Sequence, residues 1–395
     1  MFDFYFYLKM NPYAYIDDCC FHYLILKSLS ILPIELIHLI NIFYISSFPI
    51  SLLACGDYHT FYYKEDMLYG FGWNEYGQLY LDSSVQKTKM SAKYLPHLID
   101  INCGSLFSVL SFQKSKINIY GIGNNYSGQI GRYVHINTIL PEKIKIDYPI
   151  LKVRCGSFHT VIITTKHVYG LGSNQYGQLS HMSEQVMNYY VPTIMNTEEI
   201  EGDIIDGCCG SCFTFLMTKD YVYGLGANKY GQLGLEDQID HHKPTLIDVK
   251  NVVQMSAGTT HTMFLCKGDL YGVGGNKYGQ LGLGHQEHCY KKQKVLSDVL
   301  SVSCGDFFTL VLCKDALYSF GANQYGQLGL DSLQDASFPQ KINLKEKILS
   351  LSCGKNFAMV NTRNGLYGFG ANGKNQLGES KKIDYIDRFI HPKKD

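Results

Sequence analysis

The sequence lacks an excess of charge of either sign. Its 395 residues include 35 Lys or Arg and 35 Asp or Glu, so the formal net charge is zero. Proteins that bind DNA, RNA or anionic membrane surfaces draw much of their affinity from excess positive charge. The even balance gives no strong nucleic-acid signal and argues against a polyanion as the main partner.

A secretory signal and a clear membrane span are also missing. The first ten residues, MFDFYFYLKM, have no basic region ahead of the apolar ones, and 13 cysteines suit a reducing compartment. We therefore expect a cytoplasmic or nuclear protein. The apolar run from Ser28 to Ser47 is long enough to cross a bilayer, but it contains Pro33, Glu35 and His38. A charged group near the bilayer centre is costly, so a membrane anchor is disfavoured.

Seven copies of one glycine-rich stretch run through the chain. The copy from Tyr223 to Leu235 reads YGLGANKYGQLGL. Each copy has an aligned glycine, Asn two residues later, Gln six residues later, and then Leu or Ile. Successive copies are 47 to 54 residues apart. The aligned residues are Gly72, Asn74 and Gln78; Gly123, Asn125 and Gln129; Gly172, Asn174 and Gln178; Gly226, Asn228 and Gln232; Gly274, Asn276 and Gln280; Gly321, Asn323 and Gln327; and Gly370, Asn372 and Gln376.

A second motif keeps the same period. It is a small residue followed by glycine, and in six of the seven copies it lies 17 residues before the aligned glycine. In the second copy the separation is 20 residues. The small residues are Cys55, Cys103, Cys155, Cys209, Ala257, Cys304 and Cys353.

The repetition argues against a phosphate-binding loop. A nucleotide site needs one glycine-rich turn that follows a strand and opens a helix. Here no helical period follows the glycines, and their spacing is neither GxGxxG nor that of a P-loop. The glycines are therefore interpreted as structural, and we expect no cofactor.

Between the two motifs the sequence alternates as β-strands do. The segment HTVIITTKHVYGLG, from His159 to Gly172, reads as strand, turn, strand. Gly268-Asp269 and Asn364-Gly365 suit tight hairpin turns with positive φ. A further strand is expected after each GQLG, often near a proline. About four strands per unit of about 50 residues is the build of a β-propeller blade, in which a small residue lets inner strands crowd the channel.

The motif distinguishes between propeller families. WD40 blades repeat at about 40–45 residues with a Trp-Asp signature, and kelch blades at about 50. This chain has one tryptophan, Trp73, and one Gly-Gly pair at the motif. The pattern CGxxHT…VYGxGxNxxGQLG instead resembles the regulator of chromosome condensation 1 (RCC1) repeat, over about residues 50 to 380. The resemblance implies an all-β, seven-bladed propeller over residues 49–390. It also implies that the Asn and Gln hydrogen-bond backbone between blades and contact no ligand.

Residues 1–48 lie outside the repeats and are mostly apolar. The stretch ILPIELIHLINIFYI has the spacing of a helix, so we expect a short helical N-terminal extension. LPIEL resembles the start of an F-box, the module that docks onto a Skp1-like adaptor of ubiquitin ligases. That resemblance implies partner contacts through Leu32, Pro33, Glu35 and Leu36. Three interpretations stay open: a helix that caps the propeller, a truncated F-box-like segment, and a membrane anchor.

Several reactive residues are explained more simply by the repeat. His59, His159 and His261 occupy the same repeat position, which predicts strand histidines bonded to backbone. Cys209 and Cys212 form one CxxC pair, and a zinc site needs a second pair or histidines. The segment GHQEHCYKKQK, residues 284–294, places His285, His288 and Cys289 close together, and a solvated loop is favoured over metal binding. We expect no catalytic residue and no metal site.

One departure from the repeat is a candidate for partner binding. The connection from Gln178 to Cys209 is 31 residues long, and the other five are 24 to 26. Its extra length contains Tyr189 and Tyr190 and an acidic run with Glu198 and Glu199. Tyrosines on a long propeller loop are typical partner anchors. The alternative is a loop that packs on its own blade.

Two functions follow as predictions. The first is a monomeric protein-interaction scaffold without chemistry of its own, which would be a substrate receptor of a ubiquitin ligase if residues 1–48 dock a Skp1-like adaptor. The alternative is a guanine-nucleotide exchange factor for a Ran-type small GTPase, the role of the family's founding member. In Ran exchange factors we expect a His in one NxxGQLG copy and an Asp in another. Here that position holds glycine in six copies and Asn375 in the seventh, and Glu75 is the only acid in the motif.

Overall fold

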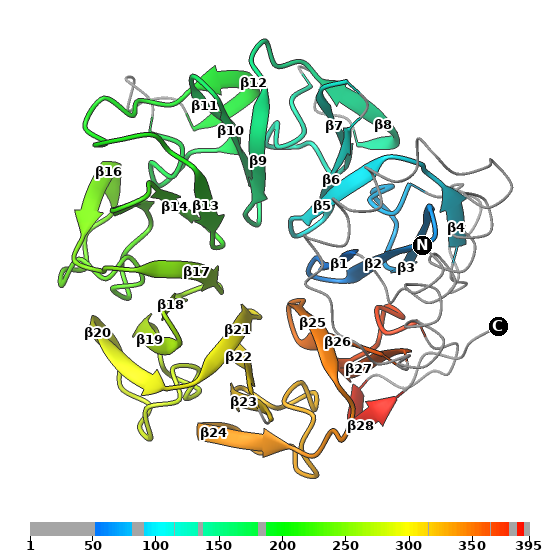
Figure 1. Cartoon of the computed structure of the whole chain (residues 1–395), viewed down its shortest axis with the longest axis vertical. Coiled ribbons are helices and arrows are strands. Elements are labelled where there is room, and N and C mark those ends of the chain that lie inside the picture. Colours follow the sequence, from blue (N-terminus) through cyan, green and yellow to red (C-terminus); the bar gives the residue numbers. More distant parts are fainter. Residues whose placement is uncertain are drawn as a thin grey trace, which may run out of the picture. The chain divides into compact units, whose positions relative to one another are not determined.

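The described part of the chain is entirely β-structure. The computed structural model describes residues 52–80, 91–113, 115–132, 137–180, 187–314, 316–363, 365–378 and 385–390. Within these ranges 28 strands form seven separate four-stranded sheets, and no residue is helical. The sheets follow one another around a central channel (Figure 1), which confirms the predicted seven-bladed β-propeller.

Each blade takes its four strands from one continuous stretch of chain. Blade 1 holds β1 (Leu52–Cys55), β2 (His59–Lys64), β3 (Met67–Gly72) and β4 (Ser91–Tyr94); blade 2 holds β5 (Leu98–Cys103), β6 (Phe107–Gln113), β7 (Ile117–Gly123) and β8 (Thr138–Ile144). Blade 3 holds β9 (Ile150–Cys155), β10 (His159–Thr164), β11 (Val168–Ser173) and β12 (Asn188–Ile194); blade 4 holds β13 (Asp206–Cys209), β14 (Phe213–Met217), β15 (Val222–Gly226) and β16 (His241–Ile247). Blade 5 holds β17 (Val252–Ala257), β18 (His261–Cys266), β19 (Asp269–Gly274) and β20 (Cys289–Leu296); blade 6 holds β21 (Val299–Cys304), β22 (Phe308–Cys313), β23 (Leu317–Gly321) and β24 (Ala336–Ile342). Blade 7 holds β25 (Ile348–Cys353), β26 (Phe357–Thr362), β27 (Gly365–Ala371) and β28 (Tyr385–Ile390), so the ring closes without exchange of a strand between the first and last blades.

The aligned glycine lies at the end of the third strand of each blade, as its last or its last but one residue. All strand pairs are antiparallel, and this glycine lies opposite the first residue of the second strand, as Gly321 lies opposite Phe308. Gly321 has a φ of +112°, and a Cβ there would lie 2.5 Å from the Phe307 carbonyl oxygen. Only glycine tolerates both the positive φ and the close backbone contact, which explains why the position repeats.

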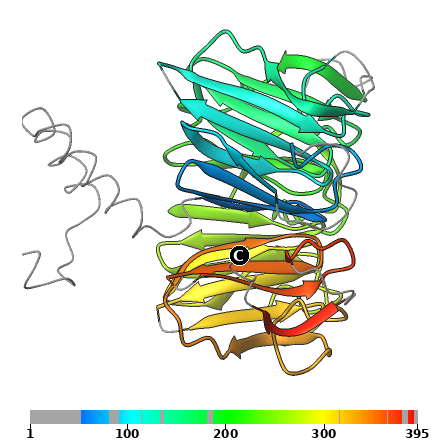
Figure 2. The ribbon, with the colours of Figure 1, turned by 90° about the vertical axis from the view of Figure 1, so that its right-hand side faces the viewer.

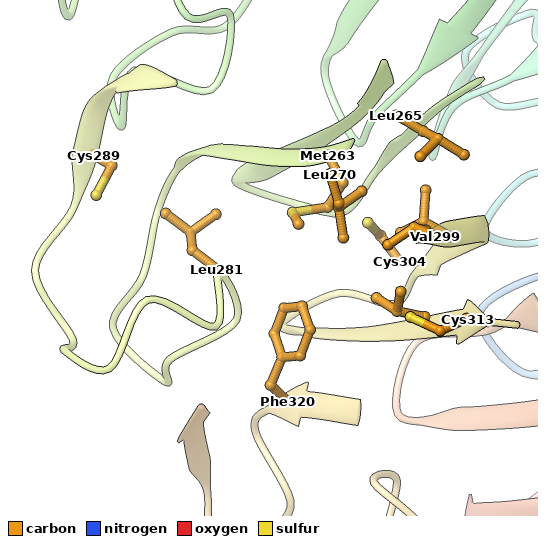
Figure 3. Close-up of a cluster of buried hydrophobic side chains, with 11 residues drawn as sticks. Met263, Leu265, Leu270, Leu281, Cys289, Val299, Cys304, Cys313 and Phe320 are labelled. Carbon is orange, nitrogen blue, oxygen red and sulfur yellow. The ribbon is translucent and has the colours of Figure 1, made fainter. Parts of the chain in front are cut away.

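The hydrophobic core lies between neighbouring blades, whose sheets stack face to face around the ring (Figure 2). Figure 3 shows the cluster between blades 5 and 6, where Met263, Leu270 and Leu281 pack with Val299 and Phe320. Leu281 is the leucine that follows Gln in the repeat motif. This Leu or Ile is at most 3 % exposed in every blade. Its burial against the next blade explains why the motif ends in an aliphatic residue.

The outer strands carry residues that discourage pairing with another sheet. Proline lacks the backbone N–H needed for pairing, and a charged lysine on an edge strand opposes edge-to-edge pairing with another strand. A proline lies within four outer strands, as the sequence indicated, and β20 carries three lysines instead. These residues are Pro141 in β8, Pro192 in β12, Pro244 in β16, Pro339 in β24, and Lys291, Lys292 and Lys294 in β20.

The motif Asn and Gln bond to backbone, but not in the predicted way. In blade 5 the Asn276 Oδ1 accepts the Leu281 N–H at 2.9 Å, and the Gln280 Oε1 accepts the Tyr278 N–H at 3.0 Å. Both bonds lie within one loop, so the expectation of side-chain bonds between blades was wrong. The link between blades uses the Gln280 carbonyl oxygen, which accepts the hydroxyl of Thr309 in the next blade at 2.8 Å.

The expectations for residues 1–48 lie outside the described residues. They comprise the helical extension, the F-box-like contacts at Leu32, Pro33, Glu35 and Leu36, and the membrane anchor. In the part of the chain that is described, no helix has the length and apolar character needed to cross a bilayer.

Candidate functional site: the channel mouth

The described part of the long connection after Gln178, from residue 187 on, packs against blades 3 and 4. Tyr189 is 8 % exposed and belongs to the core with Leu179 and Met195. The expectation that Tyr189 anchors a partner was therefore wrong, because alternation along β12 directs its ring inward. Tyr190 is half-buried. Glu199 is exposed and forms an ion pair with Lys243 of blade 4 at 3.3 Å.

Glu198, the first acid of this run, is also exposed. Its backbone N–H bonds to the Asn196 Oδ1 at 3.2 Å, which fixes the start of the acidic turn. The acidic run is thus accessible on the surface, while one of the two predicted tyrosines is not.

The three repeat histidines link neighbouring blades. Each is fully buried, and its Nε2 lies about 3 Å from a hydroxyl on the next blade: Ser108 for His59, Thr214 for His159 and Thr309 for His261. Burial lowers the pKa of all three to about 3, so they stay neutral. They are structural, as expected, but their partner is a hydroxyl of the adjacent blade and not backbone.

The candidate metal ligands are also held by the fold. His288 Nδ1 accepts the Asn276 N–H at 3.0 Å, and the His285 carbonyl accepts an Asn276 side-chain N–H at 2.8 Å. These bonds close the loop after the blade 5 motif. Burial raises the pKa of the Cys212 thiol. Among the residues described, no three His, Cys, Asp or Glu side chains are grouped as a metal site would require.

The seven small-Gly motifs meet at the centre of the ring. Each forms a three-residue turn, here called a channel turn, between the first and second strands of its blade. Together they line a cavity of about 110 Å³, here called the channel mouth. The channel turns are Cys55–Asp57, Cys103–Ser105, Cys155–Ser157, residues 209–211, residues 257–259, residues 304–306 and residues 353–355.

A closed ring of backbone hydrogen bonds fixes the width of the channel mouth. The third residue of each turn donates its N–H to the turn of the next blade, as Asp57 does to the Ser105 carbonyl at 3.3 Å. Six further bonds of 3.1 to 3.4 Å continue the ring, and the last runs from the Lys355 N–H to the Asp57 carbonyl. Six of the seven bonds reach the third residue of the next turn and one reaches Gly258, and together they make a rigid frame for the side chains at the third position.

Those side chains divide the channel mouth into two arcs. Blades 2 to 5 present hydroxyls, and blades 6, 7 and 1 present Asp306, Lys355 and Asp57. Lys355 Nζ lies 3.7 Å from the Asp306 Oδ2. The Ser105 hydroxyl donates to the Asp57 carboxylate. Two carboxylates and one ammonium therefore share one side of the cavity.

One lysine does not fully compensate the two carboxylates. Burial, with repulsion from Asp57, raises the pKa of Asp306 to about 6, although Lys355 opposes this. Burial also raises the pKa of Asp57. For Lys355, burial acts to lower the pKa, but attraction to Asp306 and Asp57 outweighs it and the pKa rises. The channel mouth is an electrostatically unbalanced, acidic site.

Apolar and aromatic side chains surround this centre. In three blades the residue after the channel turn is an apolar Leu106, Phe158 or Phe307, and Phe158 is 41 % exposed. Tyr58 packs edge-on against Trp73 with ring centroids 5.5 Å apart. The motif loops lie at the same end of each blade, because the aligned glycine pairs with the start of the second strand. They add Tyr126 and Tyr325, which are 58 % and 42 % exposed.

Known proteins share this repeat. Five segments match the model of the regulator of chromosome condensation (RCC1) repeat, at residues 118–163, 167–217, 219–265, 267–312 and 314–360, which is more than half of the chain. The chain belongs to the RCC1 repeat family. This confirms the resemblance inferred from the motif.

Curated relatives with RCC1 repeats match over parts of their length. The chain is 26% identical to the mouse regulator of chromosome condensation over 199 residues, 45% of this chain and 47% of the relative. It is 30% identical to human probable E3 ubiquitin-protein ligase HERC4 over 219 residues, 52% of this chain and 20% of the relative. The match thus spans about half the length of the first relative and a fifth of the second.

A solved RCC1 propeller shares the fold. Prp20p from Saccharomyces cerevisiae superposes with a TM-score of 0.69 at 20% identity, and the match covers 79% of this chain and 82% of that chain. At this identity the likeness concerns the fold alone.

Sequence reasoning missed the charged arc of this RCC1-type ring. The signal lay in the residue after each small-Gly pair, where four copies have Ser or Thr and three have Asp57, Asp306 and Lys355. An alignment of the copies shows the difference. Only the closed ring shows that the three charged positions are consecutive.

Proposed function

We propose that this chain is a non-catalytic protein-binding scaffold that docks its partner on the face around the channel mouth. The observation that carries the proposal is the exposure of Tyr126, Phe158 and Tyr325 on that face, each above 40 %. Aromatic side chains are enriched in protein interfaces and lose little conformational entropy on binding. The hydrogen-bonded ring below them holds the face rigid, which lowers the cost of association.

A pair of tyrosines on opposite faces tests the proposal. Tyr126 lies on the proposed face, and Tyr221, 40 % exposed, lies in the β14–β15 hairpin at the other end of its blade. Partners captured by the full-length chain are identified by mass spectrometry and their affinities measured. We expect Tyr126→Ala to weaken binding about tenfold and Tyr221→Ala to leave it unchanged. Equal affinities for both variants would contradict the choice of face.

The alternative is nucleotide exchange on a Ran-type small GTPase. It is supported by the similarity to the mouse regulator of chromosome condensation, and by Prp20p, whose structure was described with its binding to Gsp1p and histones. The exchange function is opposed by the motif itself, because six copies have glycine at the position where we expect the His and Asp of an exchange factor. The test is release of a fluorescent GDP analogue from purified GTPase. Release no faster than the unassisted rate eliminates this function.

A ubiquitin-ligase version of the scaffold is supported by the similarity to HERC4 and by the F-box-like LPIEL. In the full-length chain, Leu36→Asp is expected to abolish retention of a purified Skp1-like adaptor and to leave GTPase binding intact. If neither the wild-type chain nor the variant retains the adaptor, only the scaffold proposal remains.

The proposal also covers compartment and assembly. All eleven cysteines in the described ranges are free thiols, which supports a cytoplasmic or nuclear location. Proline and lysine on the outer strands support a monomer. Fluorescent tagging and light scattering test these two points.

A further inference from the structure

We propose that the channel mouth receives one basic side chain, an arginine or a lysine, from the protein that docks on this face. The inference rests on the proposed binding function and adds the chemistry at its centre. It starts from the third position of the channel turns, where three blades carry charged residues and the other four carry hydroxyls.

The charges at the channel mouth leave a formal excess of one negative charge. Asp306, Lys355 and Asp57 follow one another around the ring, and Lys355 Nζ lies 3.7 Å from the Asp306 carboxylate. No ion pair to a second cation is found for Asp57 within the described residues. Its contacts are the Ser105 hydroxyl and the long-range attraction of Lys355. A second cation is what this arrangement lacks.

The cavity has room for such a group and stays reachable. Its volume of about 110 Å³ corresponds to several water positions. Asp306 is 20 % and Lys355 35 % exposed, so both face the opening and are not sealed below it. The backbone ring prevents collapse of the cavity. A planar guanidinium or an ammonium group can therefore enter without rearrangement of the turns.

The hydroxyl arc supplies the remaining hydrogen-bond partners. Ser157 and Ser211 bond to each other at 3.0 Å, and Thr259 bonds to Asp306. A hydroxyl oxygen accepts from an incoming N–H as readily as it donates. An arginine, with five N–H donors, can thus contact carboxylates on one side and hydroxyl oxygens on the other.

The surroundings favour a protein side chain over a free ion. A zinc site needs three or four protein ligands, and no group of three such side chains exists in the described part of the chain. Tyr58 and Phe158 border the mouth, and Tyr126 lies farther out. A charged centre enclosed by aromatic contacts that exclude water is the usual arrangement of an interface hot spot. Exclusion of water strengthens the attraction at the centre.

The test uses the full-length chain with argininamide as the probe. Citrullinamide is the control, because it has nearly the same shape and the same α-amino group but lacks the guanidinium charge. Trp73 is the only tryptophan and contacts Tyr58, whose ring lies 5.6 Å from the Lys355 Nζ. Its fluorescence therefore reports on the mouth. We expect saturable quenching or enhancement with argininamide and none with citrullinamide.

Three variants give the expected pattern. The double variant Asp57→Asn, Asp306→Asn should weaken argininamide binding at least about tenfold. Lys355→Gln removes the competing cation, so it should tighten binding severalfold, a gain that a purely structural role would not produce. Ser157→Ala is the matched control in the hydroxyl arc and should change affinity less than the double variant does. Circular dichroism checks that each variant is folded.

The results that overturn the inference are definite. The inference is wrong if argininamide gives no saturable response, or if both probes give equal responses. It is also wrong if neither the double variant nor Lys355→Gln changes the affinity for argininamide. Failure here leaves the scaffold proposal standing if Tyr126→Ala still weakens partner binding. If Tyr126→Ala has no effect while argininamide binds as expected, the docking face is wrong and the charged site remains.

Discussion

Replacement of Asp306 by Asn should stabilise the protein above pH 6 and have little effect at pH 4. The Asp306 carboxyl is only 20 % exposed, and burial raises its pKa from 3.8 to about 6 despite Lys355. The folded state therefore holds this proton more tightly than the unfolded state. Asparagine keeps the shape and still accepts a hydrogen bond from Thr259, but it carries no charge to bury.

The magnitude follows from linkage. Because the folded pKa lies above the unfolded one, the contribution of Asp306 to stability is present below pH 4 and is lost as the pH rises to about 6. The difference between 3.8 and about 6 corresponds to about 3 kcal/mol. Asp306→Asn should thus raise the free energy of unfolding by up to about 3 kcal/mol at pH 7.5, relative to its effect at pH 4.

Urea unfolding at pH 4, 5, 6 and 7.5, followed by circular dichroism, measures this effect. Asp298→Asn is the control, because Asp298 is 76 % exposed and pairs with Lys314 only at 3.8 Å. It should change stability little at any pH. A stabilisation by Asp306→Asn that does not vary with pH, or a loss of stability at pH 7.5, would refute the reasoning.

Three further predictions concern the repeat itself. His261→Ala should destabilise the folded protein by about 3 kcal/mol because it leaves a buried cavity. His261→Phe should stay within about 1 kcal/mol of the wild type, since phenylalanine fills this position in four other blades. Thermal unfolding distinguishes the two variants. Gly321→Ala, with its Cβ 2.5 Å from a backbone oxygen, should lower the free energy of unfolding by about 3 kcal/mol. Gly268→Ala, with open space around it, should lower it by about 1 kcal/mol. Equal losses in urea unfolding would contradict the steric explanation. Cys155, whose pKa burial raises strongly, should resist alkylation in the folded protein, while the less enclosed Cys212 reacts first. Mass spectrometry of pulse-labelled protein tests the order, and early labelling of Cys155 would count against burial of its thiol.

Most of the fold could be predicted because its signals are local. The aligned glycine, Asn and Gln lie within seven residues, and the Asn and Gln side chains bond to backbone N–H groups of the same loop, as the 2.9 Å bond from the Leu281 N–H to Asn276 shows. Strand alternation and turn glycines likewise act over a few residues. One detail differed: the tight turn of blade 5 is Lys267-Gly268, both with positive φ, and not Gly268-Asp269.

The candidate site was harder to predict for a physical reason. Tyr189 and Tyr190 are adjacent in a long connection, and their sequence gives no sign of which ring turns inward. In the structure strand alternation buries Tyr189 against Met195, and Tyr190 is half-buried. Whether a residue of β12 faces solvent depends on the blade beside it, which short-range patterns do not encode.

The sequence by itself determined the seven blades, their strand order and the chemistry of their turns, because each of these is repeated within every unit of about 50 residues. Tertiary structure alone decided which third-position side chains meet at the channel mouth. Asp57 and Lys355 stand at opposite ends of the repeat array and become neighbours only when the last blade packs on the first, where the Lys355 N–H reaches the Asp57 carbonyl. Closure of the ring, and not any motif, assembles the acidic arc.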